Sequence, residues 1–281
     1  MKTITRKTML YKTSVEYGDY TMNHVFGCAH GCKYPCYAFL MAKRFGKVAS
    51  YEDWIKPQLV GNTLDILNGE IPRLKPKIKS VQLCFSTDPF MYGYDEVTNM
   101  SLSAIEKLNT SDIKCTVLTK GLLPIELASM SKENEYGITL ISLDEKYREK
   151  VEPGAVSYEI RLAALRALHN KGFKTWLSIE PYPTPNLITQ DLGVILKTAA
   201  FADKIIFGRT NYCKNVSEYK NHRHFYDDQA NKVIRFCVNN NIQYHIKNGT
   251  LTESTNKKQH HSKNSCHAKH VKETGHYLLS Q

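Results

Sequence analysis

The stretch that decides the fold and chemistry of this chain is Gly27-Cys28-Ala29-His30-Gly31-Cys32-Lys33-Tyr34-Pro35-Cys36-Tyr37. Its three cysteines recur at every fourth position, and Gly27 and Gly31 directly precede the first two. Glycine adopts positive φ angles at little cost, so these positions allow the loop to curl and bring three thiols together. The stretch is therefore predicted to form a metal-binding loop.

Three cysteines supply one ligand fewer than a closed tetrahedral zinc site requires. His24 and His30 lie close enough in the sequence to provide the fourth, so the residues leave structural zinc open. A 4Fe-4S cluster held by three cysteines would instead keep one iron free to bind a reactant. Unligated thiols are the third interpretation, and the spacing alone favours the cluster over the other two.

The loop resembles the cluster loop of radical S-adenosylmethionine (SAM) enzymes, whose usual pattern is C-x3-C-x-aromatic-C. This chain departs from it by Pro35, which stands between the aromatic Tyr34 and the last cysteine. The flanking words Gly-Cys-Ala-His-Gly-Cys and Cys-Tyr-Ala are similar to the branch that contains spore photoproduct lyase, a DNA-repair enzyme. The resemblance implies a 4Fe-4S cluster on Cys28, Cys32 and Cys36 that chelates and reduces SAM. It also implies a 5′-deoxyadenosyl radical that abstracts hydrogen from a substrate, and a reductant such as a flavodoxin or ferredoxin.

Beyond the loop, short β-rich runs alternate with helical patterns. The runs are Val81–Ser86, Lys114–Thr119, Gly137–Leu143, Lys174–Ile179 and Lys204–Phe207, and the helices lie at about 98–108, 123–130, 157–171 and 190–201. A strand at Thr21–Phe26 makes six βα units, and a helix near 227–240 with a strand at Ile242–Lys247 would add a seventh. Alternation of this kind favours parallel strands. We expect an α/β fold, a partial (βα)6 TIM-like barrel with a parallel sheet, and the resemblance implies the same open barrel.

The sequence pattern is less regular in the N-terminal part of the chain. Residues 1–20 are polar and basic and are expected to form an arm that leads into the first strand. Tyr37–Arg44 is predicted to be a helix, and Tyr51–Leu67 one or two more, ended by Gly69 and Pro72.

In parallel βα folds the chemistry lies where the strands end. Further short motifs resemble those of the lyase branch and occur in the same order. Together with the loop, they cover residues 21–185. They are Ser86-Thr87-Asp88-Pro89, Leu118-Thr119-Lys120, Ser142-Leu143-Asp144 with Glu152-Pro153-Gly154 and Arg161, and Ser178-Ile179-Glu180-Pro181. The ordered combination is more specific than any one word.

SAM carries a carboxylate, an amino group, a ribose diol and an adenine, so its pocket needs a cation, hydroxyl groups and an aromatic wall. At the matched positions, Lys120 can pair with the carboxylate and Tyr34 can pack beside the adenine. Ser86 and Ser142 can hydrogen-bond the aminoacyl and ribose groups. The alternative is a solvated lysine and serines that cap helices.

Glu180 and Asp88 are two further candidates for this pocket. We expect them to position substrate or to form ion pairs with Arg161 or Arg209.

One catalytic candidate follows from the resemblance, and a second from its position next to the last cysteine of the loop. The spore enzyme is understood to use a cysteine as hydrogen donor, within a word similar to Cys-x-Ser-Asp. Here the word is Cys84-Phe85-Ser86-Thr87-Asp88, one residue longer. If the two motifs are aligned on the serine, Cys84 occupies the position of the hydrogen donor. If they are aligned on the aspartate, Phe85 occupies that position and no thiol donor is present. Tyr37 is a candidate radical relay, with a packed aromatic as the alternative.

The composition indicates which binding partners and which cellular compartment to expect. The formal charge is +11, from 38 Lys and Arg against 27 Asp and Glu, which favours a polyanionic partner such as nucleic acid. Eight cysteines, three of them clustered, indicate metal chemistry in a reducing compartment, so the cytoplasm is expected. There is no secretory segment at the start and no apolar run of membrane-spanning length, so no membrane association is expected.

The composition changes at Gly249, which divides a predicted barrel at 1–248 from a basic tail at 249–281. The tail carries five of the chain's eleven histidines and five lysines, a composition typical of flexible arms that contact phosphates. The favoured interpretation is a radical SAM enzyme acting on a large substrate, with nucleic acid as the preferred class. The competing class is a non-enzymatic, zinc-holding nucleic-acid-binding protein on the same scaffold.

Overall fold

The main sheet holds seven parallel strands within residues 1–252, the part of the chain that the computed structural model describes. Their order across the sheet is β11-β10-β9-β8-β7-β6-β3, and β2 adds an antiparallel edge at β3. The bounds are β2 (Tyr11–Lys12), β3 (Tyr20–Met22), β6 (Ser80–Leu83), β7 (Lys114–Thr119), β8 (Glu135–Thr139), β9 (Lys174–Tyr182), β10 (Lys204–Arg209) and β11 (Gln243–Ile246). The predicted α/β fold with a parallel, partial barrel is confirmed, and the seventh unit is present.

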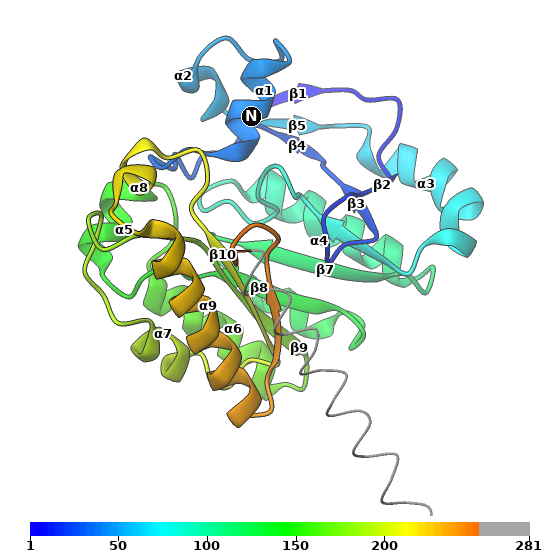
Figure 1. Cartoon of the computed structure of the whole chain (residues 1–281). Helices are drawn as coiled ribbons and strands as arrows, with labels where there is room; N and C mark the ends of the chain where they lie inside the picture. The colour runs from blue at the N-terminus through cyan, green and yellow to red at the C-terminus, as the bar shows by residue number, and fades with distance from the viewer. Residues whose placement is uncertain (253–281) are drawn as a thin grey trace, which may run out of the picture.

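Helices connect successive strands and cover the outer face of the curved sheet (Figure 1). They are α3 (Thr63–Leu74), α4 (Asp95–Asn109), α5 (Glu145–Val151), α6 (Tyr158–Asn170), α7 (Leu192–Thr198), α8 (Lys214–Glu218) and α9 (His222–Asn239), with the 3-10 turns η1 (Lys75–Lys77) and η2 (Ile125–Ser129). In α6 the Ser157 side chain accepts a hydrogen bond from the Ile160 amide and caps the helix. Its buried face recurs every three to four residues, which is why the segment packs as a helix against the sheet.

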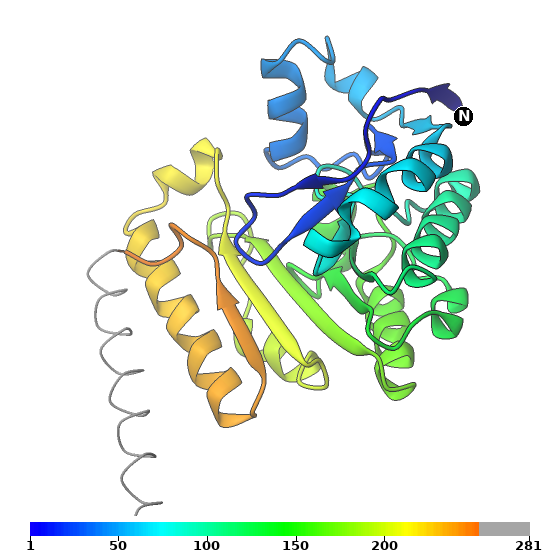
Figure 2. The same cartoon turned by 90° about the vertical axis from the view of Figure 1, so that its right-hand side faces the viewer.

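A smaller sheet with strand order β1-β5-β4 lies beside α1 and α2, and together they form a lobe at one end of the main sheet (Figure 2). Its strands are β1 (Lys2–Ile4), β4 (Val25–Phe26) and β5 (Gln58–Val60), and its helices are α1 (Tyr37–Arg44) and α2 (Tyr51–Trp54). The predicted helix at Tyr37–Arg44 is confirmed.

Three predictions in this region are wrong. Thr21–Phe26 is not one strand, because β3 and β4 pair in different sheets. Residues 1–20 are not simply a polar arm, because Met9 and Leu10 are buried and both donate their amides to the buried Glu70 carboxylate. Helix α3 continues through Gly69 and Pro72 to Leu74. Tertiary packing overrode the helix-breaking signals there.

The N-terminal hairpin bridges the first and last strands of the open barrel. Its Glu16 carboxylate contacts His245 Nε2 at 2.6 Å and accepts the Asn248 amide at 3.2 Å, both at the end of β11. Tyr17 packs edge-on against Phe85 and Trp176, with ring centroids 6.0 and 6.1 Å apart. A segment read from sequence as an arm thus closes the side of the barrel.

The predicted tail lies almost wholly outside the described residues, at 253–281. The four residues before that range pack on the body, since Leu251 is buried and Thr252 donates to the Asp227 carboxylate. Within the described part of the chain, no helix combines the length and apolarity needed to cross a membrane.

Trp176 packs against β8 at Gly137, where the absence of a side chain leaves room for the indole. A Cβ on Gly137 would lie 2.4 Å from the indole, whereas a Cβ on Gly69 in α3 would meet nothing within 4 Å. We expect Gly137→Ala to lower the free energy of unfolding by about 1–3 kcal/mol through overpacking. The matched Gly69→Ala should raise it by about 0.5–1 kcal/mol through helix propensity. Denaturant titration measures both, and equal effects of the two variants would contradict this account of the barrel interior.

Candidate active site at the carboxyl ends of the strands

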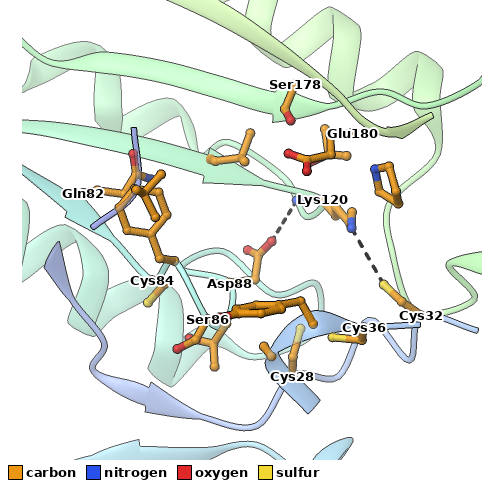
Figure 3. A pocket seen from close by; sticks show the side chains of 18 of the residues that line it. Cys28, Cys32, Cys36, Gln82, Cys84, Ser86, Asp88, Lys120, Ser178 and Glu180 are labelled. Atoms are coloured by element: carbon orange, nitrogen blue, oxygen red, sulfur yellow. Dashed lines mark hydrogen bonds between the residues drawn. The ribbon is translucent and has the colours of Figure 1, made fainter. Parts of the chain in front are cut away.

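A cavity of about 600 Å³ opens where the main strands end, beside the cysteine loop (Figure 3). Site residues predicted from the sequence line it together: Cys28, Cys32, Tyr34, Cys36, Tyr37, Cys84, Ser86, Asp88, Lys120 and Glu180. Ser142 does not line it. That side chain is buried and accepts a hydrogen bond from the Asp144 amide, which makes it a turn residue beneath the site.

Two separate segments hold the cysteine loop. On one side, the Cys28 amide donates to Trp54 O at 2.9 Å and the Tyr51 hydroxyl donates to Cys32 O at 2.8 Å. Gly27 has a φ of 85°, and a Cβ there would lie 2.6 Å from Trp54 O, so the turn requires glycine.

On the other side, the loop lies against the turn at 151–156. The Lys33 amide donates to Val151 O at 2.7 Å, and the Gly154 amide donates to His30 O at 3.0 Å. A Cβ on Gly154 would lie 2.3 Å from Ala29 O, so only glycine permits this approach. The Glu-Pro-Gly word thus supports the loop from behind.

The three thiols face one pocket, which suits a group larger than one ion. Among residues 1–252, no three His, Cys, Asp or Glu side chains have the spacing to hold a single metal ion. A four-iron cluster is wider than one ion, so its thiolates stand farther apart, and three soft sulfur donors fit it. Both proposed fourth zinc ligands have other contacts: His24 with Ser101 Oγ at 2.7 Å, and His30 with Asp88 at 2.8 Å.

Electrostatics at the loop oppose a bare thiolate. Burial raises the pKa of the Cys28 and Cys32 thiols, because the charged form loses hydration. The Lys120 ammonium, 3.9 Å from Cys32 Sγ, acts in the other direction on Cys32.

Asp88 ties the ends of two strands together. It accepts hydrogen bonds from Thr119 Oγ1 at 2.6 Å and from the Lys120 amide at 2.8 Å. Burial opposes its ionisation, but His30 and these donors outweigh it and lower the pKa of Asp88. The expected ion pair of Asp88 with an arginine is wrong, because its partner is His30.

A buried charge network stands behind Lys120. The Tyr34 hydroxyl donates to Glu152 Oε1 at 2.9 Å, and Lys120 Nζ lies 3.5 Å from the same oxygen and hydrogen-bonds Tyr34. Arg161 Nη2 donates to Glu152 Oε2 at 2.8 Å, and both side chains are fully buried. Burial favours a neutral lysine, yet Cys32 and Glu152 outweigh it and raise the pKa of Lys120. The sequence around Glu152 indicates no role for this carboxylate, which only its distant contacts reveal.

The other predicted residues have specific partners. Ser86 Oγ donates to Asn23 Oδ1 at 2.9 Å. Glu180 pairs with Lys247 at 3.2 Å, not with Arg161 or Arg209 as expected, and burial raises its pKa.

Cys84 directly follows β6 and has a φ of 56°; its thiol is buried in the pocket lining, 3.5 Å from His24 Nδ1. Burial raises the pKa of the Cys84 thiol to about 12, so it is protonated at neutral pH. Tyr37 is exposed and stacks on Tyr212, with ring centroids 6.2 Å apart.

Removing the cation from the buried network should be costly. We expect Arg161→Met to lower the free energy of unfolding by about 3–5 kcal/mol, because it leaves the Glu152 carboxylate without its closest partner. The double variant Glu152→Gln/Arg161→Met should recover part of that loss, since no buried carboxylate is then left unpaired. Denaturant titration of the set tests the coupling, and additive losses would show that the two side chains act independently.

Comparisons with known proteins agree with this geometry. The family model described as "Radical SAM superfamily" matches residues 22–187. An uncharacterised protein of Methanocaldococcus jannaschii is 26% identical over 223 residues, 78% of this chain and 80% of that protein. The uncharacterised protein ORF301 of Acidianus two-tailed virus is 26% identical over 194 residues, 64% of this chain and 63% of that protein.

Among solved structures, the chain is similar to a spore photoproduct lyase mutant with dinucleoside spore photoproduct, at a TM-score of 0.64 and 17% identity. A second lyase mutant, with bound AdoMet and dinucleoside spore photoproduct, gives 0.63 and 16%. Each match covers 86% of this chain and 80% of the other. These likenesses establish a lyase-like fold.

The family implies a 4Fe-4S cluster and SAM as cofactors, and the donor set of the pocket fits the first of them. With a family model matched over more than half of its length, this chain belongs to the radical SAM superfamily and is a radical SAM enzyme.

Proposed function

We propose that this enzyme reductively cleaves SAM at a cluster held by Cys28, Cys32 and Cys36, and abstracts hydrogen from a nucleic-acid substrate. The observation that carries the proposal is the meeting of these thiols with the Lys120 ammonium in one pocket at the strand ends. When bound, the cluster supplies the electron that breaks a carbon–sulfur bond of SAM, and the resulting 5′-deoxyadenosyl group takes the hydrogen. The chain's own residues bind and orient the reactants.

Lys120 is the residue best placed to bind the SAM carboxylate. Its network combines two cations, Lys120 and Arg161, with one anion, Glu152, and so carries a net charge of +1. Because Arg161 is fully buried, the excess positive charge is presented to the pocket at Lys120 Nζ. A carboxylate there would form a charge-assisted hydrogen bond in a partly desolvated site, where such bonds are strongest.

Ser86 and Tyr34 complete the proposed SAM site. Ser86 Oγ is fixed by its bond to Asn23, which leaves lone pairs to accept from an amino group or ribose hydroxyl. Tyr34 lines the pocket beside Lys120, whose Nζ lies 4.9 Å from the ring centroid, and is the proposed aromatic wall for the adenine.

Cys84 and Tyr37 remain proposed catalytic residues. The neutral, buried Cys84 thiol has a transferable hydrogen and faces the pocket, which supports a donor role. Tyr37 adjoins the last cysteine, which supports a relay role.

Nucleic acid is the proposed substrate on grounds of charge and fold. The chain carries a net charge of +11, and a lyase of the same fold has been solved with a dinucleoside spore photoproduct. The proposed reductant is an acidic one-electron carrier such as a flavodoxin or ferredoxin, since lysines are exposed in the cluster loop (Lys33) and in the helix and turn that follow it (Lys43 and Lys47). Clustered cysteines that hold a metal centre suit a reducing cytoplasm.

Replacing a ligand should remove the iron. We expect Cys28→Ala, Cys32→Ala and Cys36→Ala each to lose the visible iron–thiolate absorption and to stop SAM cleavage under anaerobic, reducing conditions. Circular dichroism should still show a folded barrel. Cys213→Ala, which alters a partly buried thiol outside the pocket lining, is the matched control and should keep its iron. Retention of four irons in two of the three ligand variants would contradict the assignment of these cysteines as cluster ligands.

Hydrogen abstraction can be followed by isotope. Deuterium-labelled single-stranded DNA and RNA, incubated anaerobically with SAM and reductant, should place deuterium in the released 5′-deoxyadenosine. The expected result is incorporation from one nucleic acid and none from labelled control peptides. Unlabelled 5′-deoxyadenosine from every nucleic acid that the protein binds would contradict the proposed substrate.

A further inference from the structure

The pocket lining includes side chains that none of the roles above uses. They come from the strand ends and loops of its C-terminal half and are Arg209, Asn211, Tyr212 and Lys247. Arg209 ends β10, and the next two belong to the loop that leads from β10 to α8. Their arrangement is specific enough to identify a ligand by its chemistry.

Arg209 and the two lysines of the pocket differ in whether a carboxylate lies close to the positive charge. Lys120 lies 3.5 Å from the Glu152 carboxylate, and Lys247 lies 3.2 Å from the Glu180 carboxylate. Among the described residues, no carboxylate lies within ion-pair distance of the Arg209 guanidinium. The pocket therefore presents an uncompensated positive charge at the end of β10, which favours an anionic ligand.

The guanidinium is also held in place. Arg209 Nε donates to Asn211 Oδ1 at 2.8 Å, which fixes the plane of the group and leaves its terminal nitrogens to donate elsewhere. A planar fork of this kind matches two oxygens of a phosphate or carboxylate, and a second donor is available from the Asn211 amide nitrogen. The preorganised pair suits a phosphodiester.

Beside this anion site stands an aromatic platform. Tyr212 and Tyr37 stack with an interplanar angle of 28°, yet their exposed fractions are 68% and 59%. Tyr212 has a φ of 58°, a left-handed conformation that costs a non-glycine residue free energy. Such backbone strain often occurs at ligand sites, and here it accompanies an exposed ring at the pocket mouth.

We infer that Arg209, Asn211 and Tyr212 form a subsite for one nucleotide of a single-stranded nucleic acid, with Arg209 and Asn211 on the phosphate and the Tyr212–Tyr37 pair under the base. The inference rests on the proposed function and deepens it by naming how the substrate is held. Base and phosphate of one nucleotide are joined by a single sugar, and the two parts of the subsite lie on neighbouring loop residues.

Single-stranded nucleic acid follows from the aromatic pair and the cavity. A ring can stack under a base only when that base is unpaired or turned out of a helix, and the contact then tolerates any base. A cavity of about 600 Å³ is of the size of small-ligand sites and is too small to admit a duplex. The rest of the strand would run over the basic surface.

Fluorescence anisotropy of labelled single-stranded DNA and RNA tests the subsite in the full-length, cluster-loaded protein with SAM present. Arg209→Gln should flatten the log-log dependence of affinity on salt by about 0.7, as expected for one lost phosphate contact to a single strand. Tyr212→Ala should weaken binding roughly tenfold without changing that slope, and Tyr212→Phe should bind as the unaltered protein does.

Matched controls separate the subsite from general surface charge and from loss of structure. Arg235→Gln removes an exposed arginine from α9, and Tyr92→Ala removes a ring that is 66% exposed and lies outside the pocket lining. Both should bind like the unaltered protein. Equal effects of Arg209→Gln and Arg235→Gln would overturn the phosphate contact, and tighter binding of duplex than of single strands would overturn the base platform. Weaker SAM binding by Arg209→Gln with unchanged oligonucleotide affinity would assign Arg209 to the cofactor instead.

Two readouts on the unaltered protein separate this inference from the proposed reaction. SAM cleavage in the absence of substrate reports on the reaction alone. Cleavage without salt-dependent binding of DNA or RNA would overturn the subsite, leave the SAM chemistry standing and favour a peptide substrate. Subsite-dependent binding without any SAM cleavage would leave the subsite standing and overturn the proposed reaction.

Discussion

The contact on which the site depends is the buried pair of Glu152 and Arg161. Arg161 donates to two backbone carbonyls as well as to Glu152, and so anchors the carboxylate in the wall of the barrel. The other oxygen of Glu152 fixes Tyr34 and Lys120, which flank Cys32. An ion pair of this kind is a weak source of stability, because both groups give up hydration. Its value here is positional: it sets where a cation and an aromatic ring stand relative to the cysteine loop.

Acidic side chains are paired with basic ones elsewhere around the pocket as well. Acidic groups in or beside its lining each contact a basic side chain: Asp88 contacts His30, Glu180 contacts Lys247, and Glu152 contacts Lys120 and Arg161. Pairing keeps buried charges tolerable and leaves an excess of positive charge toward the open space. An unpaired buried carboxylate would repel a negatively charged group in the pocket, such as the carboxylate of SAM.

The barrel is open, and its gap is bridged by the hairpin that carries Tyr17. Glu16 joins that hairpin to the end of β11. The pocket is therefore enclosed by the earliest and latest described parts of the chain, which lie far apart in the sequence.

Local signals in the sequence determined the cysteine loop, the parallel βα order and the helix at Tyr37–Arg44, because each depends on residue type and short-range periodicity. They also indicated the strand-end residues that line the pocket. Tertiary structure alone decided the placements: Glu180 pairs with Lys247 instead of an arginine, Ser142 lies beneath the site instead of in it, and Met9 and Leu10 are buried within the N-terminal segment. These outcomes depend on which distant segments meet, and a carboxylate has the same local pattern whichever cation it finally meets. The stack of Tyr37 on Tyr212 is of the same kind, since a contact between residues so distant in the chain leaves no mark in the sequence around either one.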